Sequence, residues 1–143
     1  MTTYLDDLAE FIHAAPSPYH VTAQVAAPTA DAGFTVLDDT PDALPTEPGG
    51  YVLVRDGAVI AWRIPENLVA QPMFRIVGAH TDSPTFRVKP QPDNTSVGYT
   101  RVGVEVYGGV LLNSWLDRDL GFAGRLVTDT EAHLVSTPAM ARI

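Results

Sequence analysis

The sequence predicts an α/β chain in which two N-terminal helices are followed by a β-rich portion. Apolar residues recur at helical spacing near the N-terminus, and a proline-rich break at 16–18 separates two helical segments. Beyond residue 50, β-branched and aromatic residues are frequent, and Asp56-Gly57 joins two such segments at hairpin spacing. A chain of 143 residues with 45% hydrophobic content can fill one core of ordinary size, so composition favours a single domain.

The first helix is expected to begin after Thr3. Its apolar residues fall on one helical face: Tyr4, Leu5, Leu8, Phe11 and Ile12. Thr3 can cap the helix, and Asp6 lies in the first turn, where a negative charge meets the positive end of the helix dipole. The pattern predicts an amphipathic helix that ends near Ala15.

A second helix is expected to begin with Ser17 as the N-cap and Pro18 in the first helical position. Proline suits that position because its φ is already helical and its missing N–H would have had no partner within the helix. Proline and glycine both interrupt helices further along. We therefore expect this helix to end by Pro28 or Gly33.

The hairpin of 51–55 and 58–64 is the clearest β-structure in the sequence. Its connection, Asp56-Gly57, favours a type I′ turn, whose two central residues both need positive φ. Before the hairpin, residues 34–37 predict a short strand, and the segment 38–50, rich in Pro, Asp and Gly, predicts a solvated loop.

Strand composition continues towards the C-terminus. Strands are expected at 73–77, 85–89, 97–107 and 110–115. The polar segment 91–96 predicts a turn. Gly108-Gly109 is expected to end the strand at 97–107. A second hairpin is expected from 124–128 and 132–136.

Charge and residue content exclude several classes of function. The formal net charge of −8, from 17 acidic against 9 basic residues, argues against broad binding of nucleic acid or anionic membrane. The sequence has no cysteine, so any metal must be held by His, Asp or Glu. The N-terminus lacks a basic segment followed by an apolar one, and no apolar run approaches ~18 residues. We expect a cytoplasmic protein with neither nucleic-acid nor membrane partners.

The stretch Gly78-Ala79-His80-Thr81-Asp82-Ser83-Pro84 carries the strongest chemical signal. His80 directly follows strand-like residues, and Asp82 stands two residues on. A carboxylate that accepts one ring N–H of an imidazole holds the other nitrogen ready to bind a metal. The pair therefore predicts a metal ligand and the residue that orients it, although a hydrogen-bonded loop histidine and a turn aspartate remain the alternatives.

For the other conspicuous residues, a structural role is a simpler interpretation than a functional one. His13 and His133 are expected at the surface, and His20 beside a helix cap. Residues 117–119, Asp-Arg-Asp, favour an ion-pair and hydrogen-bond cluster over direct catalysis. Trp62 and Trp115 are expected to anchor a core or an interface. Tyr107-Gly108-Gly109 is expected to meet a backbone requirement, because glycines permit bends or close approach that other residues do not.

Four ordered motifs give the chain a family resemblance. They are Ser17-Pro18-Tyr19-His20, the 78–84 stretch with Arg87-Val88-Lys89, Val106-Tyr107-Gly108-Gly109, and residues 115–125, Trp-Leu-Asp-Arg-Asp-Leu-Gly-Phe-Ala-Gly-Arg. Their order is that of the aspartyl aminopeptidase family of zinc metallopeptidases, which the chain resembles from about Leu8 to Ile143. The resemblance covers roughly the first third of a typical member.

The resemblance implies a fold, a cofactor and partners. Residues 1–143 would form the N-terminal part of a zinc-peptidase (phosphorylase/hydrolase-like) catalytic domain, incomplete in this chain and ending near or within the start of an inserted oligomerisation domain. It implies two Zn²⁺ per complete active site, with His80 as a metal ligand and Asp82 as its orienting carboxylate. The remaining ligands and the glutamate general base would lie downstream of Ile143. Peptide substrates, the C-terminal portion of the enzyme and further copies in a homo-oligomer are the implied partners.

The implied function is hydrolysis of N-terminal residues from peptides. The resemblance implies a preference for Asp or Glu at the peptide N-terminus. Because a catalytic zinc site takes about three protein ligands, the isolated 143-residue chain is expected to be inactive. The alternative is a non-catalytic binding or assembly module that pairs with another chain. A third possibility is that the remaining portion is supplied as a separate chain.

Overall fold

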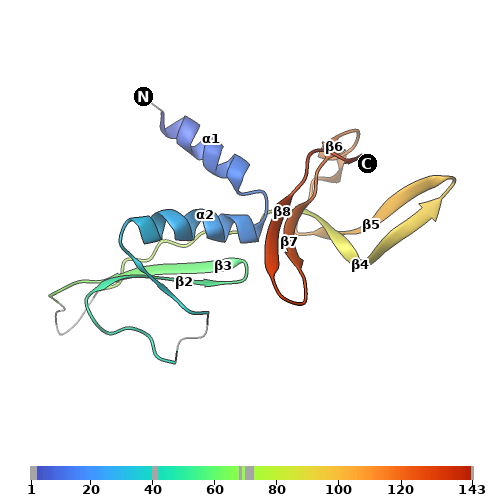
Figure 1. Ribbon diagram of the computed structural model, residues 1–143. Helices are drawn as coiled ribbons and strands as arrows, with labels where there is room; N and C mark the ends of the chain where they lie inside the picture. Colours follow the sequence, from blue (N-terminus) through green and yellow to red (C-terminus); the bar gives the residue numbers. More distant parts are fainter. Residues whose placement is uncertain (1–2, 40–41, 68, 70–72, 143) are drawn as a thin grey trace.

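The computed structural model describes residues 3–39, 42–67, 69 and 73–142 (Figure 1). Two helices come first, α1 (Tyr4–Ala14) and α2 (Pro18–Asp31). The remaining elements are β1 (Thr35–Leu37), β2 (Gly49–Arg55), β3 (Ala58–Ile64), β4 (Thr85–Ser96), β5 (Tyr99–Tyr107), a 3₁₀ turn η1 (Leu112–Ser114), β6 (Asp119–Leu120), β7 (Ala123–Val127), β8 (Ala132–Ser136) and β9 (Ala141–Arg142). The expected order, helices first and strands afterwards, is confirmed.

Both helices begin where local chemistry predicts. Thr3 caps α1 in a capping box: its hydroxyl accepts from the Asp6 N–H, and its own N–H donates to the Asp6 carboxylate at 3.0 Å. In α2, Ser17 is the N-cap and Pro18 the first residue. The helix continues through Pro28 and ends before Gly33, whose φ of 88° suits glycine. The second of the two expected stops is therefore the correct one.

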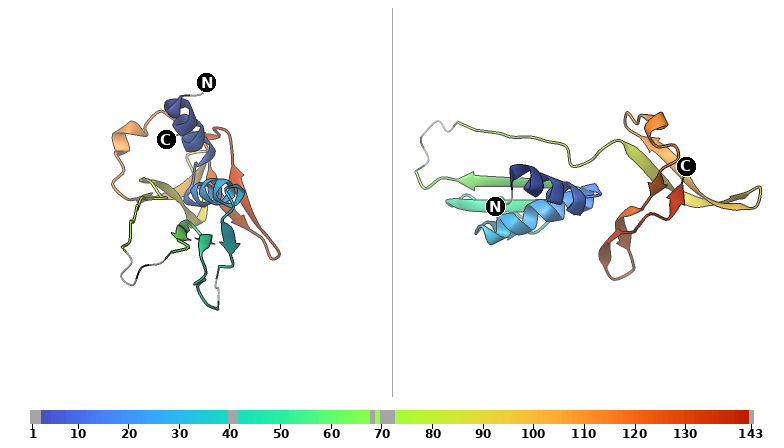
Figure 2. Two further views of the ribbon diagram at one scale, coloured as in Figure 1. Left: turned by 90° about the vertical axis from the view of Figure 1, so that its left-hand side faces the viewer. Right: turned by 90° about the horizontal axis from the view of Figure 1, so that it is seen from above.

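A three-stranded sheet lies against α2 (Figures 1 and 2). Its order is β1-β2-β3, with β1 parallel and β3 antiparallel to β2. The predicted hairpin is confirmed, but its type I′ turn is wrong: Asp56 has a φ of 52°, whereas Gly57 has no positive φ. The core of this unit holds Val52, fully buried in the middle strand, and Thr22, which is 2% exposed on α2.

The long ribbon of β4 and β5 differs from the prediction around its turn. The polar segment 91–96, expected as a turn, continues β4 past an irregularity between Val88 and Asp93. That irregularity contains two prolines, which lack the N–H that a regular ladder needs. The turn itself is Val97-Gly98, and both residues have positive φ, 53° and 82°. It was missed because valine rarely adopts this conformation.

Two expected strands are absent from the structure. Residues 73–78 form no ladder with any described residue, and Val77 is 99% exposed. A strand exists only with a neighbour, so favourable composition at 73–77 was not sufficient. At 110–115 the chain instead forms η1, with the Ser114 and Trp115 N–H groups donating to carbonyls three residues back.

The C-terminal part forms two further antiparallel pairs. The expected second hairpin is confirmed as β7 and β8, closed by the Thr128 N–H donating to the Glu131 carbonyl at 2.8 Å. β6 pairs with β9 at the described end of the chain. In the right-hand view of Figure 2, these ribbons lie at one end of the molecule and α1, α2 and the three-stranded sheet at the other. No helix among the described residues is long and apolar enough to cross a membrane.

Candidate metal-binding site

The His80-Thr81-Asp82 segment lies between the two ends of the molecule. It follows the extended residues 73–79 and precedes β4, which begins at Thr85. The Thr81 hydroxyl donates to the Gly57 carbonyl at 2.6 Å and so attaches the segment to the turn of the β2–β3 hairpin. A side-chain bond to backbone here fixes the position from which His80 and Asp82 project.

His80 and Asp82 face each other as the sequence predicts. His80 Nδ1 lies 3.0 Å from Asp82 Oδ1. The His80 side chain is 92% exposed, whereas the Asp82 side chain is 32% exposed. An imidazole that donates from Nδ1 to a carboxylate keeps Nε2 unprotonated, which is the state that binds a metal ion. The structure thus brings together the two predicted site residues; the ligand role of His80 stays a prediction.

Tyr107 is the site residue that sequence reasoning missed. Its hydroxyl donates to Asp82 Oδ2 at 2.5 Å, and its ring lies beneath the Arg87 guanidinium, 3.5 Å from Cζ to the ring centroid. The expectation of a backbone requirement at 107–109 holds for Gly108, whose φ is 71°. Tyr107 could have been found only by knowing that it pairs with Thr85 across β4 and β5, close to Asp82.

The hydrogen bonds set the charge states of this cluster. Donation from Tyr107, and secondarily from His80, lowers the pKa of Asp82 below its ordinary value. The same bond to Asp82 raises the pKa of Tyr107, because ionising the phenol would remove a donor beside a carboxylate. At neutral pH the arrangement therefore holds an ionised Asp82 and a protonated Tyr107.

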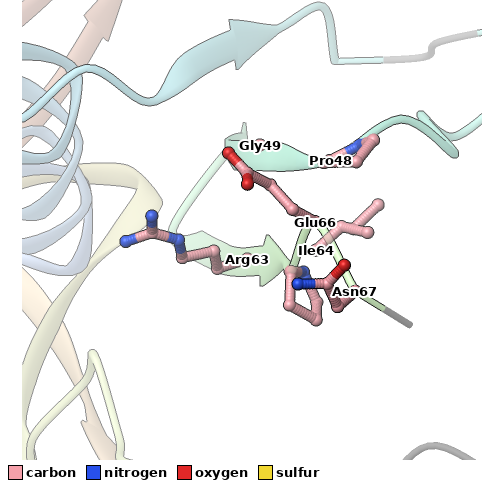
Figure 3. A pocket seen from close by; sticks show the side chains of 7 residues that line it. Pro48, Gly49, Arg63, Ile64, Glu66 and Asn67 are labelled. Atoms are coloured by element: carbon pink, nitrogen blue, oxygen red, sulfur yellow. The ribbon is translucent and has the colours of Figure 1, made fainter. Parts of the chain in front are cut away.

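His80, Asp82 and Arg87 line a groove that is larger than a second hollow of the described structure. This groove, of about 1270 Å³, is walled by the start of α2, the start of β4 and residues of β7 and β8. The smaller hollow, about 490 Å³, lies at the open end of the β2–β3 hairpin between Pro48 and Asn67 (Figure 3). Its charged lining residues are Arg63 and Glu66, with no histidine. The larger groove is therefore the better candidate site.

The His80–Asp82 pair fits one part of a zinc site. An exposed imidazole with its second nitrogen held by a carboxylate is the arrangement that zinc-binding histidines use. Within the described ranges, no group of three or more His, Cys, Asp or Glu side chains could hold a metal ion. Since catalytic zinc takes about three protein ligands, His80 needs additional ligands to form a complete site.

The other conspicuous residues have structural surroundings. His20 Nδ1 lies 2.7 Å from the Ser17 hydroxyl, beside the start of α2 as expected. His13 is exposed, and His133 is half-exposed at 3.3 Å from Glu131. In the 117–119 cluster, Asp119 forms an ion pair with Arg142 at 2.6 Å. Both tryptophans are half-buried against aromatic rings, Trp62 on Tyr51 and Trp115 on Phe86.

Comparison with known proteins gives consistent results. The family model described as aminopeptidase I zinc metalloprotease (M18) matches residues 11–140. The chain is 48% identical over 146 aligned residues to a probable M18 family aminopeptidase 2 of Streptomyces coelicolor, covering 96% of this chain and 34% of that protein. It is 52% identical over 120 residues to the protein of the same name from Mycobacterium leprae, covering 84% and 28%.

Solved structures extend the similarity to the fold. The crystal structure of yeast aminopeptidase 1 (Ape1) superposes with a TM-score of 0.82 at 30% identity, covering 92% of this chain and 32% of Ape1. Ape4, in a cryo-EM structure of its complex with Nbr1, gives a TM-score of 0.80 at 34% identity, covering 92% and 26%. The chain thus spans about a third of the length of its curated relatives, and it belongs to the M18 family of zinc metallo-aminopeptidases.

Proposed function

We propose that this chain is the N-terminal segment of a zinc-dependent aminopeptidase that removes N-terminal residues, preferably Asp or Glu, from peptides. The observation that carries the proposal is the His80–Asp82 pair, 3.0 Å apart at the wall of the larger groove. Family membership supports the zinc chemistry and the aminopeptidase activity. The acidic preference rests on the resemblance to aspartyl aminopeptidases alone.

In this proposal the residues of the chain bind one metal ion and orient the ligand that holds it. His80 provides Nε2 as a metal ligand, and Asp82 holds its Nδ1–H so that the ring keeps one tautomer and one orientation. Bound zinc in such enzymes polarises the scissile carbonyl and lowers the pKa of a coordinated water. The other ligands and the general base are assigned to the portion of the relatives that lies beyond the matched third. Residues 1–143 are accordingly proposed as part of the catalytic domain, ending near or within the start of an inserted oligomerisation domain.

Partners and location follow as further parts of the proposal. The expected partners are peptide substrates, the C-terminal portion of the enzyme and further copies in a homo-oligomer. The similarity to Ape1 supports the oligomer, because one structure of that protein is described as a dodecamer. Cytoplasmic location remains a proposal from the sequence, and fractionation of the source cells tests it.

The decisive experiment transplants this chain into a relative. Residues 1–143 replace the matched N-terminal third of the Streptomyces coelicolor protein, and zinc content and release of N-terminal Asp from a peptide are measured. The transplant is expected to bind zinc and release Asp faster than Leu, and the 143-residue chain alone to do neither. His80→Ala should reduce release at least about 100-fold, whereas His133→Ala, at a half-exposed histidine on β8, should leave it unchanged.

Two results would contradict the proposal. One is an active, zinc-loaded transplant whose His80→Ala variant keeps both properties. The other is metal-dependent release of Asp by the isolated chain. Chelation of zinc from the transplant with an excess of a strong chelator should abolish release, and added zinc should restore it.

A binding or assembly module is the second candidate function. It is favoured by the exposed apolar segment 73–77, in which Met73 is 90% and Val77 99% exposed. Such a surface is typical of chains that pair with a partner. A transplant that assembles at the relative's mass but holds no zinc, with His80→Ala having no effect, would favour this candidate.

A further inference from the structure

We infer that Tyr107 is a positioning residue for the proposed metal ligand: its hydroxyl fixes Asp82 so that the other carboxylate oxygen holds His80 with Nε2 presented to a metal. This inference deepens the proposed function and rests on it for the metal's role. The three side chains form one hydrogen-bonded series. Tyr107 Oη lies 2.5 Å from Asp82 Oδ2, and Asp82 Oδ1 lies 3.0 Å from His80 Nδ1.

The carboxylate needs such a restraint because the ring that it orients is almost fully open to solvent. Asp82 lies in a short loop before β4, its side chain is 32% exposed, and the His80 ring is 92% exposed. Holding an exposed pair in one geometry costs side-chain entropy, and a further group that fixes one partner reduces that cost. A second hydrogen bond on the far oxygen selects one rotamer of Asp82 and, through it, one orientation of the imidazole.

The sheet explains how Tyr107 reaches Asp82 from 25 residues away. Tyr107 is the last residue of β5, and it pairs directly with Thr85, the first residue of β4. Asp82 stands three residues before Thr85, so the ladder brings the tyrosine ring beside the loop. The register of the β4–β5 ribbon therefore sets the position of the hydroxyl relative to the carboxylate.

Arg87 fixes the tyrosine ring in turn. Arg87 pairs with Glu105, which puts it diagonal to Tyr107 on the same face of the ribbon. Its Cζ lies 3.5 Å from the ring centroid, within the range of a cation–π contact. The ring, half-buried in this way, directs its hydroxyl at Asp82 from a rigid element rather than from a loop.

The first test reads the tautomer of His80 in the zinc-depleted transplant, where the relative supplies the rest of the protein. Long-range ¹H–¹⁵N correlation at a pH where the ring is neutral should find Nδ1 protonated and Nε2 unprotonated. Tyr107→Phe keeps the ring and its stacking but removes the donor, and should increase the Nε2–H share. Tyr99→Phe is the matched control, because Tyr99 lies at the opposite end of β5 and is 74% exposed. A His80 tautomer that Tyr107→Phe leaves unchanged would overturn the inference.

The second test measures zinc affinity of the transplant by competition with a chelator. Tyr107→Phe should weaken binding about 10- to 100-fold, the usual effect of removing a group that orients a metal ligand. Its kcat should fall while KM changes little, because Tyr107 touches no substrate in this proposal. In an Asp82→Ala background, Tyr107→Phe should cause no further loss, since the effect acts through that carboxylate. Equal losses from Tyr107→Phe with and without Asp82 would contradict the inference.

The two tests separate this inference from the proposed function. A transplant that gains neither zinc nor activity contradicts the proposed function, while the His80 tautomer in its zinc-depleted form, which needs no metal, still decides the role of Tyr107. Conversely, an active zinc enzyme that depends on His80, but whose zinc affinity is unchanged by Tyr107→Phe, overturns the inference alone.

Discussion

The helix-covered sheet of β1–β3 and the ribbons of β4–β9 differ in how they cover their apolar side chains. Val52 and Thr22, the fully buried residues of the described structure, both belong to the first region. In the second region, Val106, Leu126 and Val127 are each more than half exposed. A two-stranded ribbon has no second layer to cover its apolar face, whereas α2 supplies that layer to the sheet.

The difference indicates which part of the chain folds by its own contacts. The first region has a helix, a parallel pair and a hairpin around one buried valine. The second region holds its shape by ladders and surface contacts, and its apolar side chains stay largely exposed. The candidate site lies where the regions meet: Thr81 binds the hairpin turn, and Tyr107 belongs to the second region.

The strongest challenge to this comparison is Val52→Asp. Introducing an unpaired carboxylate into the buried position should destabilise the first region by about 3 kcal/mol or more. Ile60→Asp is the control, because Ile60 is 61% exposed on β3, and its effect should stay within about 0.5 kcal/mol. Urea unfolding in a Trp115→Phe background, where Trp62 is the single tryptophan, measures both changes. Equal losses from the two variants would mean that Val52 does not lie in a core.

Arg125 connects the two regions, so its substitution tests how strongly they are coupled. It lies on β7 and reaches the first region twice, with Nη1 2.7 Å from Asp56 Oδ1 and Cζ 4.5 Å from the Tyr19 ring centroid. Removing both contacts with Arg125→Ala should cost about 1 kcal/mol and separate the unfolding transitions reported by Trp62 and Trp115. Arg142→Ala removes an ion pair within the second region and should leave the Trp62 transition in place. A Trp62 transition that moves equally in both variants would contradict this connection.

The smallest expected effect concerns the start of α1. Hydrogen bonds from the Thr3 N–H, and secondarily from its hydroxyl, lower the pKa of Asp6 below its ordinary 3.8. Because the folded pKa is the lower one, this contribution to stability is present above pH 3.8 and is lost as the pH falls through the folded pKa. NMR titration of the Asp6 carboxyl should find a midpoint below 3.8, and Thr3→Val should raise it only partly. A midpoint that Thr3→Val leaves unchanged would exclude the hydroxyl as a contributor.

Local features were predictable because their causes lie within a few residues. The capping box of Thr3 and Asp6 lies within one helical turn, and the β2–β3 hairpin is encoded by two strand segments and a two-residue connection. The His80–Asp82 contact is of the same kind, since a spacing of two residues already places the groups within reach. The order of helices and strands was predictable for the same reason, because most of these elements were expected from the residues within them.

Features that depend on distant neighbours were missed or wrong. Residues 73–77 have strand composition but no neighbouring strand among the described residues, and composition cannot supply one. The Val97-Gly98 turn adopts positive φ at a valine because the pairing of β4 with β5 puts the turn there. Tyr107 was not recognised as part of the site because its partner lies 25 residues away.

By itself the sequence determined the helix starts, the central hairpin, the metal-ligand candidate and the family to which the chain belongs. These rest on short-range spacing, residue chemistry and the order of motifs. Only the tertiary structure decided that Tyr107 holds Asp82, which strands find partners and where the buried core lies. Each of these is a contact between segments far apart in the chain, and local residue preferences cannot specify such contacts without the register that packing imposes.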